Sequence, residues 1–230
     1  MSLNAVHQIS KINTILWDWN GTLLNDVEIC LNAINELLDK RRHSVLSLST
    51  YKDIFTFPVK EYYIKAGFDF SREPFDKVAI EFINLYAEHV KNAAVFPEVT
   101  GILHRFKKAG FSQYIVSAME HTFLKETIEN KGILNLLDGF SGITDHYAGS
   151  KLEMAKRFLQ IQDIDPETSC LIGDTMHDFE VSESLGLPCL LVASGHQSEN
   201  RLRKTGAPVF QSLGDVATFF QINHSEIDSI

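Results

Sequence analysis

A short segment near the N-terminus combines residue types that can do nucleophilic chemistry. Residues 17–23 read Trp-Asp-Trp-Asn-Gly-Thr-Leu. Trp17 is the last residue of a short apolar run, 15–17, that is typical of a buried strand. Asp18 therefore stands where the strand ends, and Gly21 lets the chain turn. A carboxylate in that position can attack an electrophile or bind a cation. This segment is the predicted centre of the chemistry.

Further polar residues follow two later apolar runs. Ser117 follows the run 113–116, while Asp174 and Asp178 follow 170–173. The carboxyl ends of strands form the binding crevice of an open α/β sheet, so we expect these side chains to converge on Asp18. Three buried carboxylates repel one another and need a cation to remain ionised. Mg²⁺ suits a site of few carboxylates completed by water and substrate phosphate.

Lys151 is a second source of positive charge. It begins a predicted helix directly after a glycine and a serine. Its ammonium group could neutralise part of the carboxylate cluster, or it could hold an anionic substrate.

The elements that must position these residues alternate along the chain. Short apolar runs predict strands at 13–17, 113–116, 170–172, 189–192 and 208–210, and helical patterns lie between the later ones. This alternation predicts an α/β fold with a parallel sheet and right-handed crossovers. The interval 25–95 breaks the pattern, because it holds helical periodicity and no convincing buried strand. We therefore expect a core domain of residues 1–24 and 96–230 and an inserted helical domain of residues 25–95.

Composition excludes several classes of partner. The chain has 230 residues, 44% of them hydrophobic, with a net charge of −9 and a pI near 5.4. That acidity argues against nucleic acid and anionic membranes, but a small anionic substrate is compatible if the site carries its own cations. The three cysteines lack metal-type spacing and are expected to be buried, reduced side chains. No apolar stretch approaches the roughly 20 residues of a membrane span, and no secretory signal is seen, so a cytoplasmic protein is expected. The sequence does not indicate an oligomeric state.

Four separated motifs together resemble one known family. They are Asp-Trp-Asn-Gly-Thr at 18–22, Ser117, Lys151, and Gly-Asp-Thr-Met-His-Asp at 173–178. In this order they resemble the haloacid dehalogenase superfamily, in the helical-cap phosphatase branch that includes phosphoglycolate phosphatases. The resemblance implies a Rossmann-like three-layer core with an inserted α-helical cap. It also implies a phosphoric monoester hydrolase that acts on a small phosphorylated metabolite.

The resemblance assigns roles to individual positions. Asp18 would attack phosphorus and form an aspartyl-phosphate. The residues that would bind the phosphoryl oxygens are Thr22 and Ser117 by their hydroxyls, and Gly21 and Ala118 by nearby backbone amides.

The remaining roles concern charge. Lys151 would balance the charge on Asp18 and the transferring group. Asp174 would bind Mg²⁺ together with the Asp18 carboxylate and the Asn20 backbone carbonyl. Asp178 would hold the water ligands of the metal or contact it directly.

Asn20 departs from the family pattern. Most relatives have an aspartate there, which protonates the leaving oxygen and then activates water, and an amide cannot do this. Three explanations remain: a phosphatase with another proton carrier, a slow enzyme for activated phosphates, or a silent protein that binds a phosphorylated ligand. We favour the first two, because the predicted metal ligands and Lys151 are present. A phosphomutase or phosphotransferase of the same fold is a further alternative. A second departure is Leu152, because relatives commonly have a proline after the lysine.

Aromatic residues and histidines near these motifs receive no catalytic role. The aromatic residues of the insertion are expected to form its core, with one or two facing substrate; they include Phe55, Phe57, Tyr62, Tyr63 and Phe70. The histidines close to the motifs, which are not expected to be catalytic, are His121, His146 and His177; His177 is expected to lie at the surface or just behind the site residues.

Overall fold

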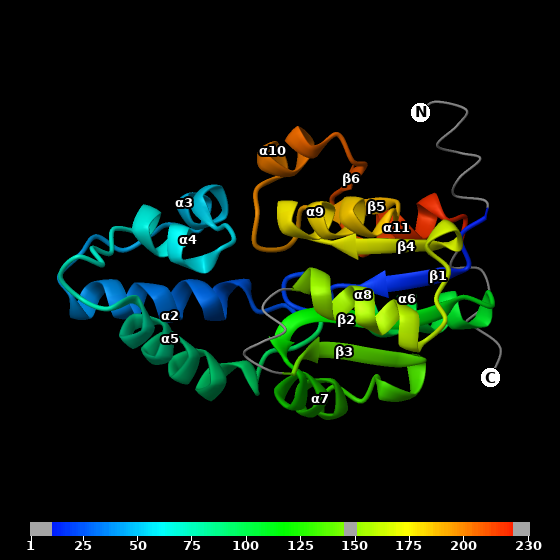
Figure 1. Cartoon of the computed structure of the whole chain (residues 1–230), viewed down its shortest axis with the longest axis horizontal. Helices are drawn as coiled ribbons and strands as arrows, with labels where there is room; N and C mark the ends of the chain where they lie inside the picture. The colour runs from blue at the N-terminus through cyan, green and yellow to red at the C-terminus, as the bar shows by residue number, and fades with distance from the viewer. Residues whose placement is uncertain (1–10, 145–150, 223–230) are drawn as a thin grey trace.

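The computed structural model describes residues 11–144 and 151–222, and its centre is a six-stranded sheet (Figure 1). All strand pairs are parallel, in the order β3-β2-β1-β4-β5-β6. The strands are β1 Thr14–Trp17, β2 Ser112–Glu120, β3 Gly139–Ile143, β4 Ser169–Gly173, β5 Cys189–Val192 and β6 Val209–Phe210. Trp17 of β1 is in register with Ile115 of β2 and Ile172 of β4. Strands β1 and β4 therefore end at nearly the same level, whereas β2 continues to Glu120. Ser117, which the sequence patterns place directly after the second strand, lies within β2.

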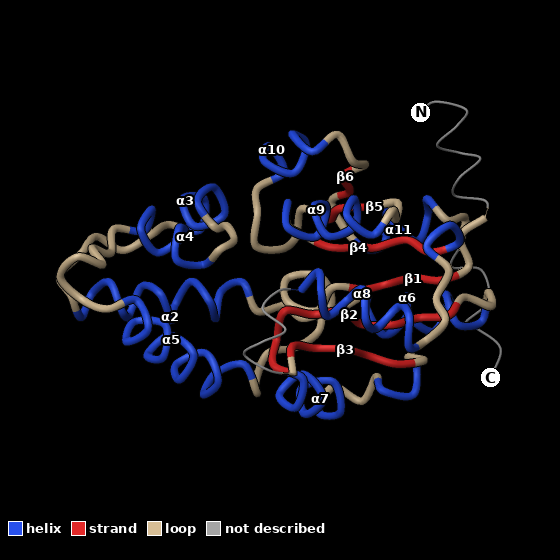
Figure 2. Tube along the Cα trace, in the orientation of Figure 1, coloured by secondary structure: helices blue, strands red, loops and turns tan. Residues whose placement is uncertain are grey.

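Helices cover both faces of this sheet, which gives three layers (Figure 2). Ile15 and Trp17 point to one face and pack in a core with α6 Val99–Lys108, α7 His121–Asn130 and α11 Leu213–Phe219. Leu16 points to the other face and packs with α8 Lys151–Ile161 and α9 Met176–Leu185. Two apolar faces on one strand require cover on both sides. The predicted α/β fold is confirmed.

A helical insertion separates β1 from β2. It contains α2 Val27–Lys40, α3 Leu48–Ile54, α4 Val59–Ala66 and α5 Phe75–Val90. Residues 18–111, all of them described, hold isolated bridges but no strand. The helices enclose a separate apolar core that includes Ile34, Leu37 and Val78. In Figure 1 the arrows of β1, β3 and β4 point toward this insertion, so it lies beyond the carboxyl ends of the strands.

Strand β3 is an element that the sequence patterns did not predict. Its residues, Gly-Phe-Ser-Gly-Ile, include two glycines, and only Gly142 is buried. It lies at the edge of the sheet next to β2, so it needs no continuous apolar run. Short elements complete the chain: α10 Glu199–Leu202 and the 3₁₀ turns η1 Leu134–Leu136, η2 Pro166–Thr168 and η3 Arg203–Thr205. Within the described ranges, no helix combines the length and apolarity needed to cross a membrane.

Candidate active site

Three carboxylates meet at the carboxyl ends of β1 and β4. Asp18 directly follows β1, and its backbone N–H continues the ladder by donating to Ile172 O at 2.8 Å. Asp174 directly follows β4, and Asp178 lies in the first turn of α9. Oxygen atoms of Asp18, Asp174 and Asp178 lie within 4.8 Å of one another, and all three residues are buried. The structure thus brings together side chains that are far apart in the sequence: Asp18 and Asp178 are separated by 160 positions.

The start of α9 fixes Asp178. Thr175 is the N-cap residue, and its hydroxyl accepts from the Asp178 N–H, while Asp178 Oδ2 accepts from the Thr175 N–H at 3.0 Å. This capping box leaves Asp178 Oδ1 facing the cluster, where it contacts Lys151. A local helix-start signal therefore also sets the geometry of the site.

Lys151 lies between two of the carboxylates. It is the first residue of α8, is 3% exposed, and its Nζ forms ion pairs with Asp18 Oδ1 and, at 2.5 Å, with Asp178 Oδ1. Burial alone would lower the pKa of Lys151, but the two neighbouring carboxylates outweigh it and raise that pKa. Lys151 is therefore a permanent positive charge within the cluster.

One ammonium group is not enough for three carboxylates. Burial raises the pKa of Asp18 well above its usual value, with Asp178 and Asp174 adding to the effect and Lys151 opposing it. Burial also raises the pKa of Asp174. If all three are ionised, three negative charges face one positive charge. A divalent cation would restore balance, and a set of carboxylate oxygens is the type of donor that hard cations such as Mg²⁺ prefer.

Gly21 is required where the chain turns after β1. Its φ is +72°, a conformation that costs a residue with a side chain roughly 1 kcal/mol or more. A Cβ at this position would collide with the Asp174 carboxylate and lie 2.5 Å from His196 Cδ2. The absent side chain therefore allows Asp174 to lie against this turn.

The predicted phosphoryl-binding residues surround the cluster, and several are already engaged. Thr22 Oγ1 donates to Asp174 Oδ1 at 3.1 Å, and Ser117 Oγ accepts from the Met119 N–H at 3.1 Å. The Gly21 N–H donates to Leu24 O and to Asp26 Oδ1, both at 2.9 Å. Ala118 is exposed and lines the cavity described below. The backbone N–H of Thr22 likewise donates to a protein acceptor, Trp19 O, at 3.3 Å.

Asn20 is held by two side chains from the insertion. Its Nδ2 donates to Asp26 Oδ2 at 2.8 Å and to Tyr86 Oη at 2.7 Å. Ser117 Oγ lies 3.5 Å from Asn20 Oδ1, on the acceptor side of the amide. The amide nitrogen thus faces hydrogen-bond acceptors and the amide oxygen faces a donor, so the side chain is fixed at the edge of the cavity.

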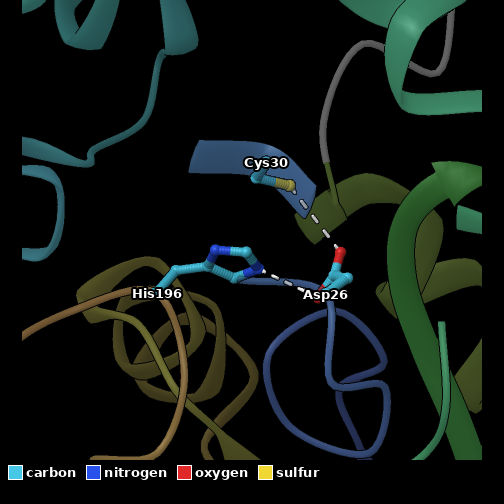
Figure 3. A group of neighbouring side chains, drawn as sticks. All are labelled: Asp26, Cys30 and His196. Atoms are coloured by element: carbon cyan, nitrogen blue, oxygen red, sulfur yellow. Dashed lines mark hydrogen bonds and ion pairs between the residues drawn. The ribbon is translucent and has the colours of Figure 1, made fainter. Parts of the chain in front are cut away.

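Asp26 is the centre of this second network, which sequence patterns did not reveal. It is fully buried and accepts from the Tyr86 hydroxyl at 2.7 Å and from the Cys30 thiol at 3.8 Å. His196 Nε2 lies 3.2 Å from Asp26 Oδ1, and Figure 3 shows both Cys30 and His196 pointing toward the Asp26 carboxylate. Although Asp26 precedes α2, its side chain makes no capping bond there.

The charges in this network are complementary. Burial alone would raise the pKa of Asp26, but His196 and the hydrogen bonds lower it below its usual value. Burial alone would lower the pKa of His196, and Asp26 raises it instead. Burial, with Asp26 adding to it, raises the pKa of the Cys30 thiol well above its usual value. We interpret the three side chains as a hydrogen-bonded ion pair with a protonated thiol, which is a poor metal ligand.

The same reasoning that identified Ser117 and Asp174 could have identified His196. It lies four residues beyond the end of β5, in the crevice formed by the strand ends. Its backbone N–H donates to Asp174 Oδ2 at 2.5 Å, and its Nδ1 lies 2.8 Å from Tyr51 Oη. Asp26 carried no such signal, because an aspartate before a helix is usually interpreted as a cap.

A cavity of about 340 Å³ opens above the carboxylates, between the core and the insertion. Its polar end includes Asp18, Asn20, Lys151, Asp174 and Asp178. Its walls are largely apolar and aromatic: Phe55, Phe57, Val59, Tyr62, Tyr63, Phe82, Ile83, Tyr86, Met119 and Phe123. Four of the five aromatic residues singled out in the sequence line it, where one or two were expected; Phe70 instead packs against Phe68 and Phe75.

The three histidines near the motifs differ in position. His121 stacks on Phe140 and its Nδ1 accepts from the Gly142 N–H, away from the carboxylates. His177 lines the cavity and lies against Phe57, with 4.7 Å between the ring centroids. His146 lies outside the described residues.

Fold and site together define a class. The parallel sheet, the inserted helices and the carboxylate cluster at the strand ends are those of a Rossmann-like hydrolase. The profile of the haloacid dehalogenase-like hydrolases matches residues 15–192. The chain belongs to this family, and the predicted family is confirmed.

Individual relatives are distant. Pyrophosphatase PpaX of Bacillus mycoides is 24% identical over 200 residues, which span 80% of this chain and 84% of that protein. The haloacid dehalogenase-like family protein SP0104 of Streptococcus pneumoniae superposes with a TM-score of 0.80 at 20% identity, over 92% of this chain and all of that one. A structure described as a predicted phosphatase from Clostridium acetobutylicum gives 0.74 at 21% identity, over 91% and 98%. At such identities the solved structures establish a shared fold.

Proposed function

We propose that this protein is a Mg²⁺-dependent phosphatase that hydrolyses a small phosphorylated metabolite through an aspartyl-phosphate on Asp18. The observation that carries the proposal is the pairing of Asp18 with Lys151 beside two further carboxylates, at the polar end of a cavity. An attacking carboxylate needs a neighbouring cation to face an anionic phosphoryl group. The distant relative named as a pyrophosphatase is consistent with phosphoryl chemistry.

In the proposed reaction an oxygen of Asp18 forms a bond to phosphorus while the bond from phosphorus to the leaving oxygen breaks. Water then attacks the phosphoryl group of the aspartyl-phosphate, which releases inorganic phosphate and restores the Asp18 carboxylate. Lys151 holds Asp18 in place and balances charge. Ser117, Thr22 and the backbone near Ala118 would position the phosphoryl oxygens.

The carboxylates of Asp18 and Asp174, the backbone carbonyl of Asn20 and, directly or through water, Asp178 would hold Mg²⁺. The ion would supply positive charge to the phosphoryl oxygens and to the carboxylate cluster. Thr22 and the His196 N–H already donate to Asp174, and a carboxylate oxygen keeps a second lone pair for a metal.

Asn20 is proposed to position groups and not to transfer a proton. An amide N–H is far too weakly acidic to protonate a leaving group, and that of Asn20 donates a hydrogen bond to the ionised Asp26. The absence of general acid catalysis at this position would slow turnover of alkyl phosphates by about 10² to 10⁴-fold. Leaving groups that depart without protonation would be much less affected.

The helical insertion is proposed to act as a cap of residues 25–95 on a core of residues 1–24 and 96–230. Its separate apolar core and its contribution of cavity walls support this assignment. A cap of this kind limits access of water during transfer.

Release of inorganic phosphate from 4-nitrophenyl phosphate with Mg²⁺ tests the proposal, with Asp18→Asn as the matched control. We expect turnover that requires both Asp18 and Mg²⁺. No release above the Asp18→Asn background, combined with thermal stabilisation by phosphate, would instead indicate a binding protein. Transfer of the phosphoryl group to an added sugar would indicate a phosphotransferase or mutase.

A further inference from the structure

We infer that the substrate is an aryl phosphate, the phosphate ester of an aromatic hydroxyl group, whose ring lies against the aromatic walls of the cavity. The inference rests on the proposed phosphatase function and specifies its substrate class. Three independent features support it: the chemistry of the walls, the size of the cavity, and the amide at position 20.

The walls offer apolar contact and little charge. Phe55, Phe57 and Phe82 contribute ring surface from the insertion, and Met119 and Phe123 face them from the core. In the described part of the chain, the basic side chains that line the cavity are Lys151, His177 and His196.

Two of these three basic groups are held by protein partners. Lys151 is bound between two carboxylates, and His196 lies between Asp26 and Tyr51. A second anionic group, such as the carboxylate of phosphoglycolate or the outer phosphate of pyrophosphate, would therefore be desolvated with one imidazole, that of His177 beside the Phe57 ring, as its basic partner among the described cavity residues. A flat aromatic ring would instead form edge and face contacts.

The size of the cavity suits one ring and a phosphoryl group. Its volume of about 340 Å³ is roughly twice the 150 Å³ that accommodates benzene in a protein interior. The polar end with Asp18 would receive the phosphoryl group, and the apolar remainder would receive the ring.

The amide at position 20 also favours aryl phosphates as the substrate class. An aryl oxide is a far weaker base than an alkoxide, so it departs from phosphorus without first receiving a proton. Without a general acid at position 20, transfer of the phosphoryl group from an aryl phosphate to Asp18 is therefore little slowed, whereas transfer from an alkyl phosphate is slowed by about 10² to 10⁴-fold.

Turnover and binding are tested separately. With Mg²⁺, kcat/KM is measured for phenyl phosphate, propyl phosphate and 2-phosphoglycolate, and we expect at least about a 100-fold preference for phenyl phosphate. Binding of benzylphosphonate, propylphosphonate and phosphonoacetate is measured by calorimetry, since these have no leaving oxygen. We expect benzylphosphonate to bind about tenfold more tightly than the other two.

Matched variants locate the ring. Phe82→Leu keeps an apolar side chain in the wall and should weaken benzylphosphonate binding about fivefold, with little change for propylphosphonate. Phe70→Leu, in the insertion but outside the cavity, should change neither.

The outcomes separate the inference from the proposed function. Equal or better use of 2-phosphoglycolate or propyl phosphate, with normal Asp18-dependent release of phosphate, overturns the substrate class and keeps the phosphatase. Tight benzylphosphonate binding without release from any ester supports the ring site and overturns the phosphatase.

Discussion

The side-chain amide of Asn20 donates a hydrogen bond to the buried carboxylate of Asp26, with 2.8 Å between Nδ2 and Oδ2. An ionised carboxylate can only accept, and an amide supplies the donor that it needs. An aspartate at position 20 would place a partly buried carboxylate in contact with the buried Asp26 carboxylate, and both could not be ionised without a penalty. Positions 20 and 26 are therefore coupled in this protein.

The first prediction exchanges the two residues. Asn20→Asp and Asp26→Asn should each lower the free energy of unfolding, while the double variant should recover about 1–3 kcal/mol relative to the sum of the two. With an acid at position 20 and an amide beside it, the double variant should also hydrolyse propyl phosphate at least tenfold faster than the natural protein. Urea unfolding and phosphate release measure these effects. Additive stabilities would show that the two positions are independent.

The second prediction concerns Lys151. Lys151→Gln leaves Asp18 and Asp178 without their buried cation, so it should lower the free energy of unfolding by about 3–5 kcal/mol at pH 7 and abolish turnover. Lys156→Gln is the control on the same helix, because its ion pair with Glu153 is exposed and should contribute less than about 1 kcal/mol. Similar losses in the two variants would contradict the proposed charge balance.

The third prediction concerns the metal. Mg²⁺ at 100 times its dissociation constant should stabilise the protein by about 2.7 kcal/mol, and EDTA should reverse the effect. Asp174→Asn removes one negative charge from the cluster, so it should raise stability in EDTA and reduce the gain from Mg²⁺. Thermal unfolding across a Mg²⁺ titration measures both. An unchanged Mg²⁺ effect in Asp174→Asn would place the ion elsewhere.

The fourth prediction concerns the turn at Gly21. Gly21→Ala introduces a Cβ that collides with Asp174 at a positive φ, so it should lower the free energy of unfolding by about 2 kcal/mol or more. Gly67 also has a positive φ, +112°, but a Cβ there would meet open space. Gly67→Ala therefore measures the cost of backbone strain alone, without a collision. Equal losses in the two variants would mean that packing against Asp174 is unimportant.

The fifth prediction concerns pH and the insertion. Arg41 donates to Glu73 at 2.6 and 3.0 Å, and its hydrogen bonds, followed by that of Lys77, lower the pKa of Glu73 to about 2. Because the folded pKa lies below the unfolded value, this stabilisation is present above about pH 4.5 and is lost as the pH falls toward 2. Glu73→Gln should lower the free energy of unfolding by about 1 kcal/mol at pH 7, since water screens the pair.

Chemical unfolding at pH 7, 5 and 3 checks this fifth prediction. The difference between Glu73→Gln and the natural protein should shrink from pH 5 to pH 3. Glu88→Gln, an exposed residue of α5, is the control and should show no such trend. A difference that is constant with pH would show that the ion pair does not stabilise the insertion.

Much of the fold and part of the site could be predicted because their signals are local. The runs around Ile15 and Ile172 have the composition of strands covered on both faces, and Asp18 and Asp174 directly follow those strands. A residue that follows a strand in a parallel sheet must lie at the carboxyl edge of that sheet. Strand β3 could not be predicted, because an edge strand with two glycines carries no apolar run.

The sequence by itself determined the alternation of five of the strands with helices, the helical insertion, and the placement of Asp18 and Asp174 directly after strands, since each depends on neighbouring residues. Only the tertiary structure decided that Asp26 joins Asn20, Tyr86 and His196, which lie up to 170 positions from it in the chain, and that rings from the insertion and the core line one cavity. The physical reason is that hydrogen bonds and cavity walls depend on distance in space. The packing of the insertion onto the strand ends sets those distances.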